Sequence, residues 1–169
     1  FSNHSFVIIH SGSIRKLSHS KYNERKNETS KASEILELPS LRHATFDQLM
    51  KIEDMIIKKR AKHIISENDR VLKAVSCLEQ DDAISFGKLM NSSHQSMRDD
   101  YEISSDELNQ VVESANKNGA LGARLTGAGF GGCVVILIKN EELKSISESI
   151  LEECSQAYLV TTISKELNS

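Results

Sequence analysis

The sequence predicts an α+β protein in which a small, mainly antiparallel sheet packs against helices. Four short segments can form strands: residues 5–10, 120–126, 133–138 and 158–163. All but residues 120–126 are rich in β-branched or aromatic residues, which is typical of strands. The long stretch between the first and second of these segments carries apolar residues at helical spacing. The 169 residues are 38% hydrophobic and 27% charged, which is ordinary for a domain with its own core.

The first part of the chain is expected to be a strand followed by two helices. Residues 5–10 (SFVIIH) are β-branched and aromatic, and they predict the first strand. A polar stretch with a sparse apolar stripe predicts a helix over residues 18–38, which Pro39 closes. Thr45 and Gln48 form a capping box, so a short helix is expected to start after Thr45.

Further helices are predicted before the second strand. Apolar residues at helical spacing over residues 52–78 indicate one long amphipathic helix, or two in series. Ser104 and Glu107 form a second capping box, and the helix that it opens runs to Lys117. Asn118-Gly119 then ends this helix, because glycine readily adopts the left-handed conformation that closes a helix.

After Gly119 the pattern changes to strands. Residues 120–126 and the continuous apolar run 133–138 (CVVILI) predict two strands, of which the second is buried on both faces. Asn140 can cap a helix that ends near residue 153. Residues 158–163 (YLVTTI) predict the last strand.

The loop between the second and third predicted strands, Gly127–Gly132, is dense in glycine. Four of the eight glycines in the chain lie in it, although glycine costs stability at a strand end because it loses the most backbone freedom. One reading is a tight connection that requires positive φ. The other is a nest of N–H groups for an anion such as phosphate. The loop is not a Walker A motif, since no Gly-Lys-Ser/Thr follows, and not a dinucleotide fingerprint, since it leads into a strand.

Four segments in order along the chain resemble one known family. Gly122–Cys133 (GARLTGAGFGGC) closely resembles the third signature motif of the GHMP kinases, and its GFGGC ending is similar to that of galactokinases. Ser93–Ser104 (SHQSMRDDYEIS) resembles the galactokinase S-H-x-S-L-R-D-D-Y-x-V-S segment. Arg60–Val71 (RAKHIISENDRV) is similar to the R-A-x-H-V-x-x-E-x-x-R-V helix, and Ser20–Arg25 (SKYNER) to the S-x-Y-N-x-R segment.

This resemblance implies transfer of the γ-phosphoryl group of ATP to the anomeric hydroxyl of galactose. It implies that Tyr22 binds the sugar, since a tyrosine combines a ring with a hydrogen-bonding hydroxyl; the other reading of Tyr22 is an aromatic side chain at the edge of the core. It also implies that the loop supports the nucleotide phosphates through six residues: Gly127, Ala128, Gly129, Phe130, Gly131 and Gly132.

The same resemblance implies that much of the active site lies outside this chain. In this family ATP and Mg²⁺ are held mainly by the N-terminal half, and no segment like G-E-H-T-D-Y or P-x-x-x-G-L-S-S-S-A occurs here. We therefore assign no catalytic residue and no metal ligand, and we expect the chain by itself neither to turn over nor to bind ATP tightly.

The start of the chain predicts a piece of a longer protein, because it begins at Phe1 and soon enters a strand-like run. Residues 1–17 are expected to join a missing N-terminal domain, and residues 18–169 to form the GHMP kinase C-terminal domain. The edge of the first strand would then be exposed and could drive self-association.

Two departures from the galactokinase pattern motivate a second hypothesis. His10-Ser11-Gly12 stands where the family usually has Asn-Ser-Asn or Asp-Thr-Asn. Ile14 stands at the first of two usually basic positions, so that only Arg15 remains as a cation. The alternative function is therefore a galactokinase-like sensor or interaction protein without kinase activity.

Several charged groups have both a structural and a functional reading. His63 and Glu67 could share a metal, but without a third ligand an ordinary pair on the helix surface is favoured. Asp99-Asp100 is expected to make structural hydrogen bonds rather than to bind a metal. Arg124 could pair with a buried carboxylate or contact a phosphate. Lys58-Lys59-Arg60 is expected to be a solvated helix face.

Composition excludes other classes of protein. The net charge is −3, the pI is near 6.1 and aromatic residues make up 5%, which argues against a nucleic-acid partner. No apolar stretch approaches the ~20 residues needed to cross a bilayer, and no signal peptide is present. The three cysteines form no C-x-x-C pair and predict reduced thiols in a cytoplasmic protein. They are Cys77, Cys133 and Cys154.

Overall fold

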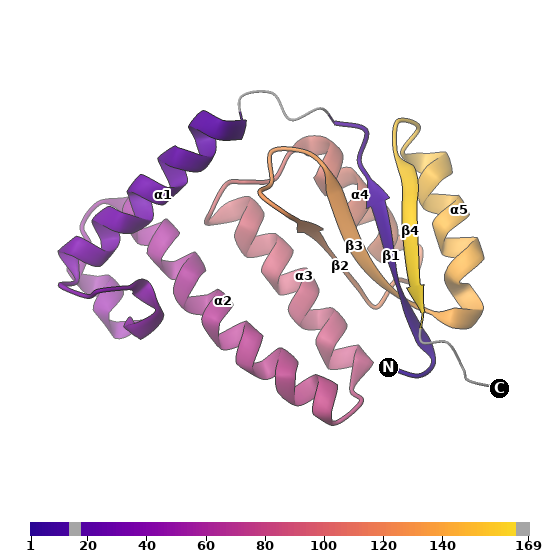
Figure 1. The fold of residues 1–169 in the computed structure, drawn as a ribbon, viewed down its shortest axis with the longest axis horizontal. Coiled ribbons are helices and arrows are strands. Elements are labelled where there is room, and N and C mark those ends of the chain that lie inside the picture. Colours follow the sequence, from indigo (N-terminus) through magenta and orange to yellow (C-terminus); the bar gives the residue numbers. More distant parts are fainter. Residues whose placement is uncertain (14–17, 165–169) are drawn as a thin grey trace.

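The computed structural model describes residues 1–13 and 18–164. Its strands and helices confirm the predicted α+β class (Figure 1). In chain order they are β1 (His4–His10), α1 (Ser18–Ile35), α2 (Met55–Glu79), α3 (Ala83–Asp99), α4 (Asp106–Lys117), β2 (Gly122–Thr126), β3 (Cys133–Lys139), α5 (Leu143–Glu153) and β4 (Tyr158–Ser164). Short 3-10 turns cover Leu41–His43, Asp47–Lys51 and Asn140–Glu142.

The four strands form one antiparallel sheet in the order β2-β3-β1-β4. The elements follow the order of a ferredoxin-like arrangement: a strand, a helical crossover, two adjacent strands, a second helix and a last strand. Here α1, α2, α3 and α4 together form the first crossover. Figure 1 shows α4 and α5 behind the sheet, with α3 beside β2 and α2 beyond α3.

The main core lies between the sheet and the α4–α5 layer. Alternate residues of the central strands point into it, such as Val7 and Ile9 on β1, because successive side chains of a strand face opposite ways. On the helices the buried positions recur every three or four residues, such as Ile146 and Ile150 on α5.

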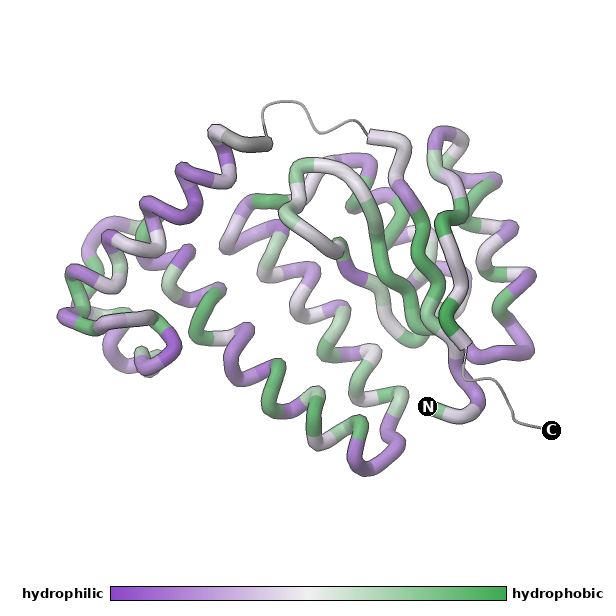
Figure 2. Tube along the Cα trace, viewed as in Figure 1, coloured by the Kyte–Doolittle hydropathy of each residue, from purple (hydrophilic) through white to green (hydrophobic). Residues whose placement is uncertain are grey.

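A second core fixes α1, which is mostly hydrophilic along its length (Figure 2). Only Ala32 of α1 and the following Leu36 enter this core, which also contains the start of α2. Helix propensity alone does not hold such a polar segment in place, so most of its stability must come from these contacts and from ion pairs. The cluster comprises Ala32, Leu36, Leu41, Leu49, Ile52, Ile57, Ala61 and Ile65.

Helix α3 packs directly on β2 because two glycines meet. A Cβ on Gly87 would lie 2.2 Å from the carbonyl oxygen of Leu121, and one on Gly122 would lie 2.2 Å from the carbonyl oxygen of Gly87. No side chain fits at either position. This close approach ties the helical layer to the strand that leads into the glycine loop.

The prediction of a free edge on the first strand is wrong. β1 pairs with β3 along one side and with β4 along the other, so both of its edges are occupied. The reason is the pairing with β4, which follows about 150 residues later in the sequence and completes the sheet. Contact between residues 1–17 and a further domain stays a prediction.

Some predicted helix starts shift by one or more residues. Ser105, not Ser104, caps α4, and its hydroxyl accepts a hydrogen bond from the amide of Leu108. Asn140 does not cap α5, since its side chain instead accepts a hydrogen bond from the hydroxyl of Ser5. The short helix after Thr45 is a 3-10 turn.

In the described part of the chain, no helix combines the length and the apolar character needed to cross a membrane.

Candidate functional site

The glycine loop has a backbone that only glycine adopts readily. The φ angles are +87° at Gly127, +79° at Gly129, +119° at Gly131 and +97° at Gly132, and Phe130 joins them at +58°. Five of the six loop residues are therefore in positive-φ conformations, which cost an L side chain free energy. This confirms that the glycines serve the loop's shape, and it leaves both readings of that shape open.

Two neighbouring segments clamp the loop. The amide of Phe130 donates to the carbonyl of Ile103 at 2.7 Å, and the amide of Ser11 donates to the carbonyl of Gly132 at 2.8 Å. A Cβ on Gly129 would lie 2.3 Å from that same Ile103 oxygen. The loop therefore has a fixed shape before any ligand arrives.

The N–H groups of the loop are largely unused. Outside the helices and strands of the described residues, only Phe130 among the six loop residues donates its N–H to a backbone carbonyl. Gly127 and Ala128 are exposed at the tip. Preformed, unpaired N–H groups at an exposed turn are what an anion-binding nest requires.

The start of α1 lies against this loop. The ammonium of Lys21 is 5.4 Å from the ring centroid of Phe130, which is within cation–π range. Tyr22, the predicted sugar contact, follows directly and is 51% exposed. A hollow of about 430 Å³ adjoins the loop, and its lining comprises Gly12, Ser13, Lys21, Ser104, Ser105, Glu107, Phe130 and Gln156.

A buried arginine joins several of the motif segments. The side chain of Arg60 is 2% exposed and forms ion pairs with Glu28 and Glu102, each at 2.8 Å. Burial alone would lower the pKa of Arg60, but hydrogen bonds to Glu102 and Glu28 raise it above its ordinary value. The prediction of a solvated face at Lys58-Lys59-Arg60 is therefore wrong for Arg60. A signal was present, because Arg60 lies three residues after the apolar Ile57 and four before Ile64, which is core-facing helical spacing.

The neighbouring His63 is buried and holds the end of α3. Its Nδ1 lies 3.0 Å from the hydroxyl of Ser96, and its ring stacks on Tyr101 with centroids 4.5 Å apart. Burial lowers the pKa of His63 to about 4, so the ring is neutral. Asp100 accepts hydrogen bonds from Ser96 and from Lys62, which confirms its structural role.

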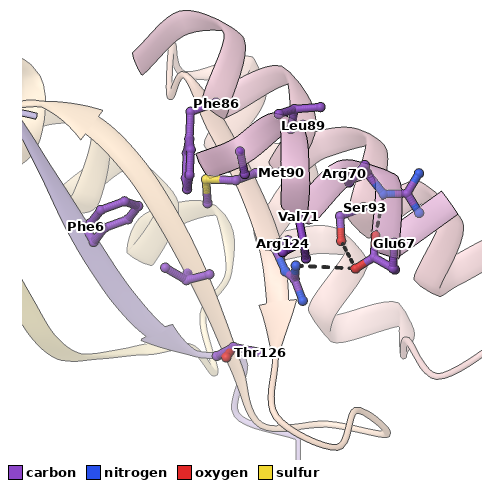
Figure 3. A pocket seen from close by; sticks show the side chains of 12 residues that line it. Phe6, Glu67, Arg70, Val71, Phe86, Leu89, Met90, Ser93, Arg124 and Thr126 are labelled. Carbon is purple, nitrogen blue, oxygen red and sulfur yellow. Dashed lines mark hydrogen bonds and ion pairs between the residues drawn. The ribbon is translucent and has the colours of Figure 1, made fainter. Parts of the chain in front are cut away.

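Glu67 is the centre of a second polar cluster, which Figure 3 shows at one end of a hollow of about 300 Å³. Its carboxylate accepts hydrogen bonds from Arg70 and from Ser93, the latter at 2.9 Å, and lies 3.6 Å from Arg124. Burial alone would raise the pKa of Glu67, but the hydrogen bonds from Arg70 and Ser93 lower it. Arg124 thus pairs with a carboxylate, which is one of the two readings given above.

The pairing of His63 with Glu67 on a helix surface is wrong, because each side chain points into a different cluster. Within residues 1–13 and 18–164, no three potential metal ligands come together. Ile14 and Arg15, the positions of the family departure, lie outside the described residues.

Comparison with known families decides the assignment. Residues 74–156 match the family described as GHMP kinases C terminal. The chain contains a GHMP kinase C-terminal domain. The matched residues include α3 with Ser93, the Ile103 segment and the glycine loop.

Full-length relatives of this GHMP kinase domain are galactokinases. The chain is 44% identical over 159 residues to the galactokinase of Clostridium beijerinckii, covering 89% of this chain and 41% of that protein. It is 41% identical over 152 residues to the galactokinase of Thermotoga neapolitana, covering 89% and 42% respectively. The chain therefore spans about two fifths of the length of these relatives.

A solved structure has the same fold. The crystal structure of Lactococcus lactis galactokinase complexed with galactose superimposes with a TM-score of 0.89 at 32% identity. The match covers 95% of this chain and 45% of that one. The match thus takes in nearly all of this chain but less than half of the Lactococcus lactis galactokinase.

Proposed function

We propose that this chain is the C-terminal part of an ATP-dependent galactokinase, which transfers a phosphoryl group from ATP to galactose. The observation that carries the proposal is the clamped glycine loop, whose free N–H groups lie beside the start of α1. The similarity to galactokinases along nearly the whole chain supports it.

The loop Gly127–Gly132 would hold the nucleotide phosphates. Phosphoryl transfer needs donors aimed at the phosphate oxygens and little movement during reaction. Backbone N–H groups supply such donors, and the hydrogen bond from Phe130 to Ile103 keeps them in place. Tyr22 would contact the sugar, because its exposed ring and hydroxyl stand on the helix whose Lys21 touches Phe130.

ATP and Mg²⁺ would be bound mainly by the part of a galactokinase that this chain does not span. The loop fits phosphate by its N–H donors, whereas the described residues offer no cluster of carboxylates for a metal. The chain would contribute contacts to the phosphate and to the sugar. We place the protein in the cytoplasm because its three cysteines are free. We place it in galactose metabolism because it is similar to galactokinases.

The second candidate is a galactokinase-like sensor without kinase activity. The departure at His10-Ser11-Gly12 favours it, since these residues end β1 beside the loop. The structure supplies another reason for His10: its Nδ1 accepts the amide of Gly12 at 3.0 Å, and its ring stacks on Tyr158 at 4.8 Å. His10 therefore has a structural role at the end of β1, and its presence does not imply that catalysis is lost.

A coupled ATP-consumption assay separates the two candidates. The polypeptide encoded by the uninterrupted reading frame around this chain is purified and given a panel of sugars. We expect turnover that depends on ATP and galactose. A folded protein that turns over no sugar would contradict the kinase and favour the sensor.

A further inference from the structure

Arg60 on α2 contacts two other segments, α1 and residues 100–102, through one planar group. Its Nε donates to Glu28 on α1 at 2.8 Å, its Nη1 donates to the carbonyl of Asp100 at 2.6 Å, and its Nη2 donates to Glu102 at 2.8 Å. We propose that Arg60 is a positioning residue that sets α1 and the glycine loop in fixed relation to one another.

On the α1 side the connection continues toward the predicted sugar contact. The carboxylate of Glu28 also accepts a hydrogen bond from Arg25, at 2.5 Å, and Arg25 is buried one helical turn after Tyr22. The apolar contacts of α1 lie near its other end, at Ala32 and beyond. The ion pairs of Glu28 with Arg25 and Arg60 therefore anchor α1 between this apolar end and the turn that carries Lys21 and Tyr22.

On the loop side the connection reaches the clamp. Glu102 has a φ of +54°, which is uncommon for a residue other than glycine and costs free energy. The ion pair with Arg60 stabilises this conformation. The next residue, Ile103, accepts the hydrogen bond of Phe130 in the loop. Arg60 thus acts on the loop through Glu102 and Ile103, without contacting it.

An arginine is required for this geometry. Its guanidinium presents donors in fixed and different directions, whereas a lysine offers one ammonium on a flexible stem. No lysine at this position reaches Glu28, Glu102 and the Asp100 carbonyl together. The charge is compensated by two carboxylates, as a buried cation demands.

The functional meaning of this connection rests on the proposed function. A kinase must hold its acceptor and its phosphoryl donor in line, and small displacements cost much of the rate. If Tyr22 contacts the sugar and the loop contacts the nucleotide, Arg60 sets the spacing between the two substrates.

Hydrogen–deuterium exchange of this chain tests the proposal without any substrate. In Glu102→Gln, we expect the amide of Phe130 to exchange about tenfold faster, which is what loss of about 1.4 kcal/mol of local stability gives. In Glu28→Gln, residues 21–25 of α1 should exchange faster instead. Arg60→Lys should accelerate both regions. Glu113→Gln is the matched control, because the Glu113 side chain is 70% exposed and its ion pair with Arg98 is long, at 3.9 Å.

The β3 amides from Val134 to Ile138 provide the internal reference and should not change in any variant. An unchanged Phe130 amide in Glu102→Gln, or a rise spread equally over β3, would overturn the proposal. If Arg60→Lys fails to fold, the two glutamine variants carry the test. The outcome is independent of the sugar-kinase assay, so a failed assay would remove the proposed function and leave this coupling measurable.

Discussion

At the scale of single residues, Gly129 has the strictest requirement. An alanine there would place its Cβ 2.3 Å from the Ile103 oxygen at a φ of +79°. We expect Gly129→Ala to lower the free energy of unfolding by roughly 2–4 kcal/mol, measured by urea denaturation. Gly119→Ala is the control, since φ is +103° but the nearest atom is 3.8 Å away, on Ile146. Equal losses of stability in the two variants would show that the close contact between Gly129 and the Ile103 oxygen does not constrain the loop.

His94 makes the fold sensitive to pH. Its Nδ1 accepts the amide of Leu125 at 3.3 Å, and its Nε2 lies 3.2 Å from the side-chain oxygen of Asn109, so both nitrogens are used by a neutral ring. Burial lowers its pKa from 6.5 to about 4. Between these values the unfolded state binds a proton that the folded state does not. The contribution of His94 to the free energy of unfolding is therefore fully present above pH 6.5. It is lost as the pH drops toward 4, by up to about 3 kcal/mol.

Urea midpoints measured from pH 7 to pH 4 check this dependence. In His94→Gln the loss over this range should be smaller than in the unchanged chain, because one of the two buried histidines no longer titrates. The remaining loss comes chiefly from His63, whose pKa burial also lowers to about 4. An identical pH dependence in both proteins would show that His94 is not held neutral.

At the scale of elements, local pattern was sufficient to predict all four strands and the long helix α2. Alternating and continuous apolar runs identify strands, and spacing of three or four identifies helices, without knowledge of tertiary contacts. The partners of charged residues could not be predicted in this way. The spacing of Arg60 indicates a core-facing position, but its partners Glu28 and Glu102 lie 32 and 42 residues away and follow from the tertiary fold.

The Glu67 cluster joins α2, α3 and β2. We expect Glu67→Gln to lower the free energy of unfolding by about 2 kcal/mol, because Arg70 and Arg124 lose their shared carboxylate in a half-buried place. Urea denaturation measures this loss. Glu79→Gln is the matched control, since Glu79 is exposed at the end of the same helix. Equal stability of the two variants would contradict a role for the cluster in fastening these elements.

At the scale of the whole molecule, the sequence located the loop and Tyr22, and the fold brings the start of α1 to the loop. The sequence could not reveal which strand lies at the edge of the sheet, because strand order depends on pairing between distant segments. The two edge strands are β2 and β4, and the residues of β4 are exposed on both faces.

We therefore expect any self-association to use β4 instead of β1. Its Leu159, Val160 and Ile163 are 47–57% exposed, and an exposed apolar edge strand can pair with another chain. Size-exclusion chromatography at two concentrations should show less association for Val160→Lys than for the control Met50→Lys, which changes an 81% exposed residue elsewhere. Equal behaviour of the two variants would exclude the β4 edge.

The central claim is that the glycine loop contacts nucleotide phosphates, and an NMR titration of the ¹⁵N-labelled chain with Mg·ATP tests it most directly. The claim predicts weak binding in fast exchange, with amide shifts concentrated in Gly127–Gly132 and at Lys21. Shifts confined to other regions, or a loop that does not respond while the chain remains folded, would contradict it.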